Sequence, residues 1–327
     1  MKKPFKILCI DGGGIKGLFS AQVLAKFEEV FSTNISDQFD LICGTSTGGI
    51  IALAASAKIP MSDVVSFYKD KGPLIFAEHK KGFFGEIWLK TKQILYKGKY
   101  SNKELKRALT EVFGSRKISE SSNLLCITAF NITTATPRVF KKDYNRFTED
   151  NKRTYVDVAL ATSAAPTYLP IHNLEADQFV DGGVWANNPS LVGLMEYLYQ
   201  FSEDDRFNGV EILSISSLEI SHGSTPMPSN CSFINWQSKL IDLFSIGQAK
   251  NIEKLFEYLD GKFKFPIHYT RVSNAPPSHE QMKIIDMDNA SEDALKLLQS
   301  IGEATANQAK MKDVIRNAFS TGKTILN

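Results

Sequence analysis

Two stretches near the start of the chain share one pattern: an apolar segment that ends in glycines and is followed by a helical repeat. Residues 5–10 (FKILCI) lead into three glycines, and residues 39–43 (FDLIC) lead into a sharp glycine turn before a helix of small residues over 49–57. The first predicted helix, over 17–31, carries an apolar stripe of Leu18, Val23, Leu24, Phe27, Val30 and Phe31. We expect two strand–loop–helix units whose strands lie parallel, joined by a right-handed crossover.

The alternation of strands and helices continues along the chain. A helix is predicted over 101–114, where Ser101 and Glu104 fit a capping box and Gly114 ends the helix. Adjacent strands follow at 124–133 and 137–143, then a helix over 155–170 that Pro166 breaks, and a strand and turn at 178–184.

Residues 187–201 then predict a helix with Asn188 as its cap and Pro189 in its first position, and residues 210–217 predict a buried strand. This order predicts an α/β fold with three layers, in which a mostly parallel central sheet is flanked by helices.

After residue 216 the pattern becomes less regular. An amphipathic helix carries a stripe that we interpret as core packing, formed by Trp236, Leu240, Leu243, Phe244, Leu255, Phe256 and Leu259. A last helix has Leu295, Leu298 and Ile301 in register. We expect residues 1–216 to form the catalytic core, and residues 217–327 to form an extension of helices and one or two strands packed on the same domain.

Composition excludes several classes of protein. The chain of 327 residues has 38 Lys and Arg against 36 Asp and Glu, a net charge of +2 that does not indicate a binder of nucleic-acid polymers. No window approaches the roughly 18 to 20 apolar residues of a membrane-spanning helix, and Asp11 interrupts the only run resembling a signal peptide. We therefore expect a cytoplasmic protein.

The cysteines give no sign of a metal site. Cys9, Cys43 and Cys126 lie in strand-like runs and Cys231 in a loop-like one, without a C-x-x-C motif or histidines at ligand spacing. We interpret them as free buried thiols, and we expect neither a metal nor an organic cofactor.

The candidate nucleophile is Ser46. Residues 44–48 (GTSTG) match G-x-S-x-G between a predicted strand and a predicted helix, which is the context of a nucleophile elbow. Such a turn holds serine in a strained backbone conformation with its hydroxyl projecting, while the glycines keep Cβ atoms away from the neighbouring strand and helix.

The glycine loop at residues 12–17 fits two motifs, the dinucleotide fingerprint G-x-G-x-x-G and a loop that offers bare N–H groups to an oxyanion. A dinucleotide site needs an acidic residue at the end of the second strand, but this strand ends in Cys43 and Gly44. We therefore predict an oxyanion hole at Gly12, Gly13 and Gly14. A second phosphate-loop match, at 322–324, lacks its first glycine and a following helix.

Ser46 needs a base, and two kinds of base are available. In an α/β-hydrolase a histidine would follow the acid, and His222, His268 or His279 could serve, although none lies in a marked motif. Asp181 stands at the end of a strand before two glycines. An aspartate is a weak base in water, so this role requires partial desolvation.

Four segments in this order resemble the patatin-like phospholipase family, and are similar in motif order to the catalytic domain of cytosolic phospholipases: DGGGIKG (11–17), GTSTGG (44–49), ATSAAPTYLP (161–170) and DGGVWANNP (181–189). The resemblance covers about the first 200 residues. It implies a Ser46–Asp181 dyad without histidine and an oxyanion hole at residues 12–14. Lys16 departs from the arginine of many members, which keeps the charge but loses the planar fork.

The resulting hypothesis is a lipid acyl hydrolase that forms an acyl-enzyme on a membrane phospholipid. An acyltransferase on the same dyad and a Ser–His–Asp esterase remain alternatives. Some bacterial members resemble this chain in size and are activated by cyclic oligonucleotides in anti-phage defence, which makes such an activator a hypothesis here. Head-group preference and homo-oligomer formation stay open.

A basic and aromatic run lies between the elbow and the capping box. From Lys80 to Arg107 there are nine Lys or Arg and two Glu, interleaved with Phe83, Phe84, Trp88 and Tyr96. Aromatic anchors beside lysines suit an anionic bilayer surface, so peripheral membrane contact is one interpretation and a solvated face is the other.

Overall fold

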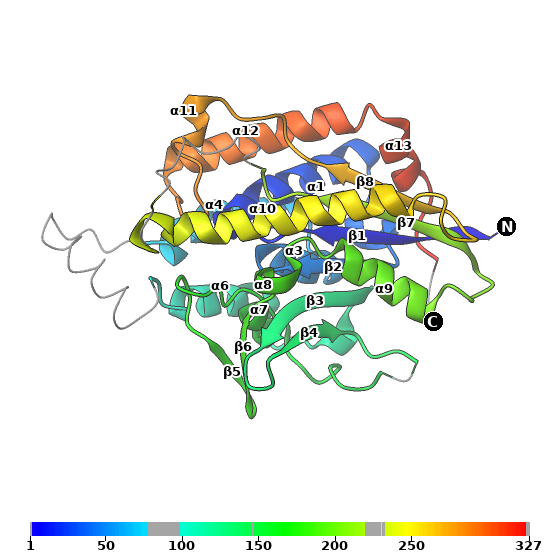
Figure 1. Cartoon of the computed structure of the whole chain (residues 1–327), viewed down its shortest axis with the longest axis horizontal. Helices are drawn as coiled ribbons and strands as arrows, with labels where there is room; N and C mark the ends of the chain where they lie inside the picture. The colour runs from blue at the N-terminus through cyan, green and yellow to red at the C-terminus, as the bar shows by residue number, and fades with distance from the viewer. Residues whose placement is uncertain (1, 78–98, 146, 220–229, 231–232, 325–327) are drawn as a thin grey trace, which may run out of the picture.

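A computed structural model describes residues 2–77, 99–145, 147–219, 230 and 233–324, and Figure 1 shows its arrangement. The described strands form one eight-stranded sheet in the order β5-β6-β3-β2-β1-β7-β8, with β4 paired to β3 outside this path. The strands are β1 (Lys3–Ile10), β2 (Leu41–Thr45), β3 (Leu124–Asn131), β4 (Thr136–Lys141), β5 (His172–Leu174), β6 (Asp177–Asp181), β7 (Phe207–Ile215) and β8 (Ile267–Val272).

Strands β3, β2, β1, β7 and β8 run parallel, whereas β4, β5 and β6 join them by antiparallel pairing. The described helices are α1 (Gly17–Phe31), α2 (Ile35–Gln38), α3 (Thr47–Ser56), α4 (Met61–Ile75), α6 (Lys103–Phe113), α7 (Tyr155–Thr162), α8 (Gly183–Ala186), α9 (Ser190–Gln200), α10 (Phe233–Leu259), α11 (His279–Met282), α12 (Glu292–Ala309) and α13 (Asp313–Ser320), with short 3-10 turns η1 (Gly14–Lys16) and η2 (Ile118–Glu120). The predicted mostly parallel α/β fold is confirmed.

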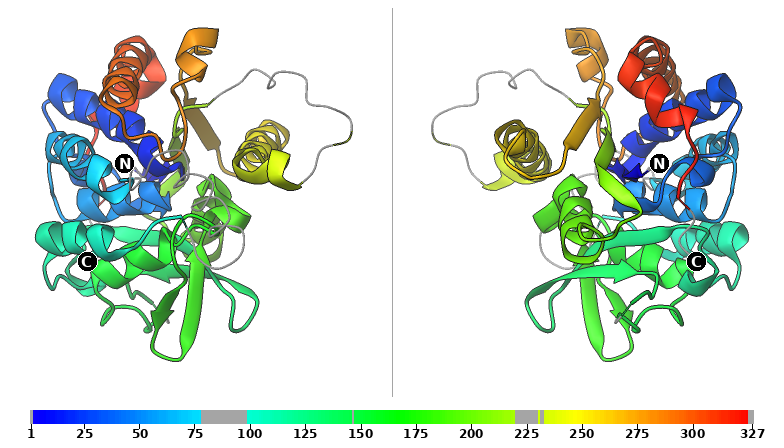
Figure 2. Two further views of the ribbon diagram at one scale, coloured as in Figure 1. Left: turned by 90° about the vertical axis from the view of Figure 1, so that its left-hand side faces the viewer. Right: turned by 90° about the vertical axis from the view of Figure 1, so that its right-hand side faces the viewer.

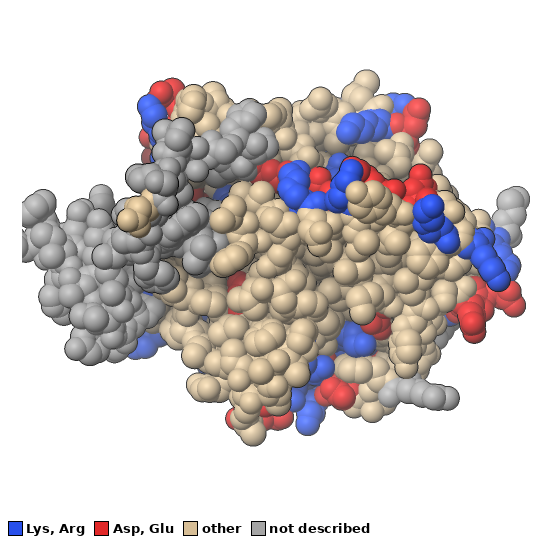
Figure 3. Space-filling model, in the orientation of Figure 1, with Lys and Arg blue, Asp and Glu red and all other residues tan. Residues whose placement is uncertain are grey.

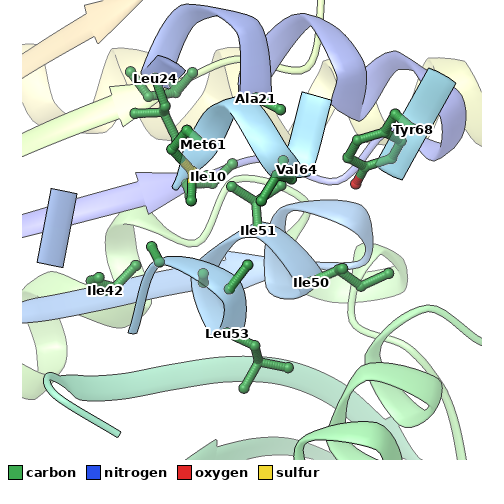
Figure 4. Packing of buried hydrophobic residues seen from close by; sticks show 14 of the residues in the cluster. Ile10, Ala21, Leu24, Ile42, Ile50, Ile51, Leu53, Met61, Val64 and Tyr68 are labelled. Atoms are coloured by element: carbon green, nitrogen blue, oxygen red, sulfur yellow. The ribbon is translucent and has the colours of Figure 1, made fainter. Parts of the chain in front are cut away.

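The sheet is covered on both faces because side chains alternate along its strands. In β1, Leu8 and Ile10 join the core beneath α1, α3 and α4, whereas Phe5, Ile7 and Cys9 join the core beneath α9 and α10. Figure 2 shows the two helical layers on opposite sides of the sheet. In Figure 4, side chains of α3 lie between the sheet and the layer of α1 and α4.

Strand β3 brings two other strand ends together. β2 pairs with it in parallel and ends with Thr45 opposite Thr128, whereas β6 pairs antiparallel and ends with Asp181 opposite Ala129. A strand has two hydrogen-bonding edges, and β4 occupies the other edge along residues 126–131. β2 and β6 therefore share one edge of β3 and run toward each other.

Three free thiols form a row across the sheet. Cys9 of β1 is paired in register with Cys43 of β2, which is paired with Cys126 of β3, and all three are fully buried. They lie beneath α9, where a Cβ added to Gly193 would stand 3.0 Å from the Cys43 sulfur. The prediction of buried free thiols is confirmed for these three, and Cys231 lies outside the described residues.

The C-terminal segment completes this sheet. β8 pairs in parallel with β7, and α12 packs against α1, where a Cβ on Gly302 would lie 2.9 Å from the Phe19 carbonyl oxygen. Leu295 and Leu298 of α12 are buried as expected, and Ile301 is partly buried against them. The division of the chain at residue 216 stays a prediction.

The predicted capping box is wrong. α6 begins at Lys103 with Asn102 at its N-cap and no side-chain cap, and Ser101 Oγ accepts only the Lys103 N–H, at 3.3 Å. The preceding residues are held elsewhere, since the Tyr100 N–H donates to the Tyr168 carbonyl at 2.8 Å. The helix therefore begins too late for a box starting at residue 101.

Two other helix boundaries differ from the prediction. α7 ends at Thr162, and the Ser163 N–H donates to the Ala159 carbonyl at 3.2 Å, so the helix stops before the residue that Pro166 itself disfavours in a helix. α9 begins at Ser190 rather than at Pro189, and Asn188 Oδ1 accepts the Ser190 N–H at 3.0 Å and its hydroxyl at 2.6 Å.

The predicted core stripe on α10 is only partly correct. Phe256 is buried, and Ile252 and Leu259 pack against the same core, but Leu243 and Phe244 are 52% and 59% exposed. The side chains of Trp236 and Leu240 lie outside the described residues. Within the part of the chain that the structure describes, no helix is both long and apolar enough to cross a bilayer.

Gly48→Ala tests the packing of α3 on β1. A Cβ at this position would lie 2.2 Å from the Ile10 carbonyl oxygen, so backbone must move, and we expect a loss of about 3 kcal/mol or more in unfolding free energy. Gly247→Ala is the matched control, since a Cβ there meets nothing within 4 Å and should stabilise α10 by about 0.5–1 kcal/mol. Equal urea denaturation midpoints for the two variants would contradict this packing.

Candidate active site

Ser46 lies at the sharp turn between β2 and α3, in a conformation that serine rarely adopts. Its φ is +55° and its ψ is −127°, and its N–H donates to Thr162 Oγ1 at 2.9 Å. The flanking glycines are required by close approach, because a Cβ on Gly44 would lie 2.3 Å from the Gly48 carbonyl oxygen. The backbone geometry is that of a nucleophile elbow.

Asp181 ends β6 and is 5% exposed. It interacts with the Ser46 side chain, and its Oδ1 accepts the Gly183 N–H at 2.7 Å. Burial raises the pKa of Asp181 from its ordinary 3.8 to about 6, and the hydrogen bonds from Ser46 and Gly183 work in the opposite direction. The structure thus joins the two residues that the sequence had placed 135 positions apart.

Hydrogen bonds from threonine hydroxyls connect the end of β2 to β3 and to neighbouring segments. Thr45 Oγ1 lies 2.7 Å from Thr128 Oγ1 and donates to the Ala186 carbonyl at 2.6 Å. Thr162 Oγ1, which accepts the Ser46 N–H, donates to the Thr128 carbonyl at 2.6 Å. A Cβ on Gly182 would lie 2.1 Å from Thr128 Oγ1, so the turn after Asp181 passes directly over β3.

The glycine loop follows β1 and lies against Ser46. A Cβ added to Gly12 would lie 3.0 Å from the Ser46 Cβ, and the Gly12 N–H donates to the Asn187 carbonyl at 3.2 Å. The N–H groups of Gly13 and Gly14 have no protein acceptor among the described residues. Gly14 has a φ of +60°, which favours glycine. Of the three loop residues, Gly13 and Gly14 therefore keep free donors.

Residues from far along the chain enclose this loop. A Cβ on Gly13 would lie 2.5 Å from Ser217 Oγ, which donates to the Gly12 carbonyl at 2.6 Å. A Cβ on Gly14 would lie 2.2 Å from the Met287 carbonyl oxygen, which accepts the Ile15 N–H at 2.8 Å. The loop lacks side chains because other backbone is packed against it.

A buried ion pair holds the start of the loop. Arg271 of β8 donates to both carboxylate oxygens of Asp11, at 3.0 and 2.6 Å, and to Ser214 Oγ at 2.7 Å. It also pairs with Glu219 at 2.8 Å and with Glu253 of α10 at 3.3 Å. Burial raises the pKa of Asp11, and the Arg271 charge opposes that rise. The C-terminal segment thereby contacts Asp11, the residue directly before the glycine loop.

An apolar cavity of about 50 Å³ opens beside Ser46. It lies between α3, α4 and the segment after α7, and its apolar lining includes Ile50, Phe67, Ile75, Phe76, Tyr168 and Leu169. Gly14 and Met287 border it next to Ser46. Such a cavity suits a hydrocarbon chain better than a polar group.

The other candidates from the sequence lie away from this site. His268 is in β8 and lines a separate groove, and His279 begins α11. No described histidine hydrogen-bonds to Ser46 or Asp181. His222 and residues 80–98 of the basic and aromatic run lie outside the described residues, whereas Lys16 is described and buried. Within the described ranges, no three His, Cys, Asp or Glu residues gather to hold a metal.

The family model described as patatin-like phospholipase matches residues 8–193, more than half of the chain. This chain belongs to that family. The acyl ester hydrolase class predicted from the sequence is thereby confirmed.

Several relatives of this patatin-like phospholipase extend over nearly its whole length. A "cGAMP-activated phospholipase" of Pseudomonas aeruginosa is 30% identical over 93% of this chain and 89% of the relative. One of the same name from Vibrio cholerae is 30% identical, covering 96% and 93%. The structure of human GIVD cytosolic phospholipase A2 is 10% identical to this chain, with a TM-score of 0.46. The match includes 97% of this chain and 60% of the human chain.

Several residues that shape the site of this patatin-like phospholipase were not predicted from the sequence. Thr162 lies in the quoted ATSAAPTYLP segment, so its nearness to the site could have been inferred from that motif. Arg271 and Met287 lie in stretches without a motif. Only tertiary packing reveals them.

Asp181→Asn tests the cost of the buried carboxylate. Since its folded pKa of about 6 exceeds 3.8, the wild type gains stability as pH falls through 6, and the ionised form is destabilising above it. Asparagine does not ionise, so we expect the variant to be about 2–3 kcal/mol more stable than wild type near pH 8, and this gain to vanish below about pH 4. Urea unfolding at both pH values measures this, and a pH-independent difference would contradict it.

Proposed function

We propose that this patatin-like phospholipase cleaves the fatty-acyl esters of membrane phospholipids through Ser46 and Asp181. Asp181 accepts the Ser46 proton as Oγ attacks the ester carbonyl, and returns it to the departing alcohol when the C–O bond breaks. In the second half-reaction Asp181 deprotonates a water that attacks the acyl-enzyme, and the fatty acid leaves as Ser46 regains its proton. The contact between the two side chains at converging strand ends carries this proposal.

The raised pKa of Asp181 supports its role as base. A carboxylate whose conjugate acid has a pKa of about 6 is a stronger base than one at 3.8, yet it remains ionised at neutral pH. Hydrolysis should therefore fall as pH drops through about 6. The absence of a histidine contact to either residue, within the described part of the chain, favours this dyad over a Ser–His–Asp triad.

The free N–H groups of Gly13 and Gly14 are the proposed oxyanion donors. Gly12, which donates to Asn187, contributes the close approach of the loop to Ser46 rather than a free donor. Preorganised backbone donors in a buried site stabilise the tetrahedral oxyanion and need no rearrangement during the reaction. The apolar cavity beside Ser46 would receive the acyl chain.

Exposed apolar side chains support peripheral membrane contact. Val184 of α8, Met195 of α9 and Phe244 of α10 are 44%, 60% and 59% exposed. In Figure 3 a row of charges follows α10, whereas the surface below it, over α8 and α9, is mostly uncharged. An uncharged face close to the Asp181 turn suits an enzyme that removes lipid from a bilayer while remaining cytoplasmic.

Ser46→Ala and Asp181→Ala should each lower release of fatty acid from phospholipid vesicles by at least about 10³-fold, while circular dichroism stays unchanged. Mass spectrometry of the products, for wild type and each variant, measures the loss and identifies the cleaved ester. His268→Ala is the control, and it should keep wild-type turnover. Hydrolysis that survives in Asp181→Ala would contradict the dyad.

We also propose that a cyclic dinucleotide activates the enzyme, consistent with the anti-phage role that the resemblance implies. Two relatives covering nearly the whole chain are named for activation by cGAMP. The C-terminal segment contacts the glycine loop through Arg271, Ser217 and Met287, so a ligand bound to that segment has a physical route to the site.

Added cGAMP should raise vesicle hydrolysis by wild type by at least about tenfold, and Ser46→Ala should remain inactive with it. The measurement compares cGAMP, other cyclic di- and trinucleotides, and linear GMP plus AMP as the uncyclised control. An identical rate with and without every cyclic nucleotide would overturn the activation but leave the hydrolase proposal intact.

A further inference from the structure

The short helix α8 links the proposed base to the glycine loop. At its start, Gly183 donates its N–H to Asp181 Oδ1 at 2.7 Å. Just after its end, the Asn187 carbonyl accepts the Gly12 N–H at 3.2 Å. The position of this single turn therefore affects both the carboxylate and the loop.

One side chain of α10 holds both ends of α8. Gln248 Oε1 accepts the Asn187 N–H at 3.0 Å. Gln248 Nε2 donates to the Gly183 carbonyl at 3.2 Å and to the Val184 carbonyl at 3.3 Å. These groups are the unpaired N–H and C=O groups expected around a one-turn helix. A neutral amide of this length can both accept and donate here.

α10 is itself fixed to the sheet next to the site. Phe256 is buried and stacks on Tyr269 of β8, with ring centroids 4.1 Å apart and planes 3° apart. Glu253 pairs with Arg271, the residue that holds Asp11. Figure 1 shows α10 lying across the front of the sheet. Gln248 thus belongs to an anchored helix, and can act as a fixed point for α8.

We propose that Gln248 is a positioning residue that holds the proposed base and the proposed oxyanion loop in register through α8. This inference rests on the proposed function of Ser46 and Asp181. A four-residue helix has too few internal hydrogen bonds to hold its own place. The amide of Gln248 supplies the missing external bonds at both of its ends.

Loss of the amide has a consequence that can be measured as a pH dependence. If α8 shifts, the Gly183 N–H moves away from Asp181, and a bond that lowers the pKa of the carboxyl group is weakened. The pKa of Asp181 then rises further, so the acid limb of the pH–rate profile moves to higher pH. A residue that merely stabilised the fold would leave that limb in place.

The test compares Gln248→Met with wild type, using p-nitrophenyl butyrate hydrolysis in the presence of cGAMP across a range of pH. Methionine keeps the length of glutamine without its hydrogen bonds. We expect kcat to fall about 10- to 100-fold, and the acid limb of the pH–rate profile to move to higher pH. KM should change little, because the acyl cavity is untouched. Lys254→Met is the control on the same helix, since Lys254 pairs with the exposed Glu257 and lies over the exposed Tyr258 ring.

Gln248→Glu supplies a second arm if the methionine variant does not fold. It keeps the acceptor for Asn187 but loses the donor to Gly183 and adds a charge near Asp181, so the acid limb should again move to higher pH. A wild-type kcat and an unmoved acid limb in whichever variant folds would overturn the role of Gln248.

Labelling with a fluorophosphonate probe separates this inference from the proposed function. Mass spectrometry should find the probe on Ser46 in wild type, and at a slower rate in Gln248→Met. If Ser46 of wild type takes no probe, the proposed nucleophile is wrong. If wild type and Gln248→Met are labelled equally fast, the nucleophile stands and the positioning role is overturned.

Discussion

The site depends on two strands that share one edge of β3 and point toward each other. β2 ends at Thr45 and β6 ends at Asp181, and their partners on β3, Thr128 and Ala129, are consecutive residues. This register therefore holds the Ser46 side chain close to the Asp181 carboxylate. Because β2 belongs to the parallel sheet and β6 to an antiparallel hairpin, the proposed nucleophile and the proposed base reach one point from opposite directions.

Several features of the site reduce stability. Ser46 adopts a strained backbone conformation, which costs about 1–3 kcal/mol, and Asp181 carries a carboxylate that burial disfavours. Cores on both faces of the sheet offset these costs, with α3 packed between the sheet and the layer of α1 and α4 (Figure 4). The strain is tolerated because the surrounding packing fixes the turn, and because Thr162 satisfies the Ser46 N–H.

Local sequence predicted the parts of the fold that depend on local chemistry. The apolar runs and glycines around Gly12 and Ser46 identified two strand–loop–helix units, because close approach and a positive φ restrict residue choice. The exposure of Leu243 could not be predicted, since one amphipathic stripe is compatible with a core or with an exposed face. Gln248 and Arg271 carry no local signal, because their partners Asn187 and Asp11 become neighbours only after folding.

The row of thiols beneath α9 is reactive in principle but is buried in the folded protein. Burial raises the pKa of Cys43 well above its usual value, so the thiolate form that reagents attack is scarce while α9 stays in place. α9 begins three residues after Asn187, the residue that holds Gly12. An alkylating reagent can reach these sulfurs only when that layer lifts from the sheet. The rate of their modification would therefore measure how often α9 moves away from the sheet, a motion that would also pull Asn187 away from Gly12.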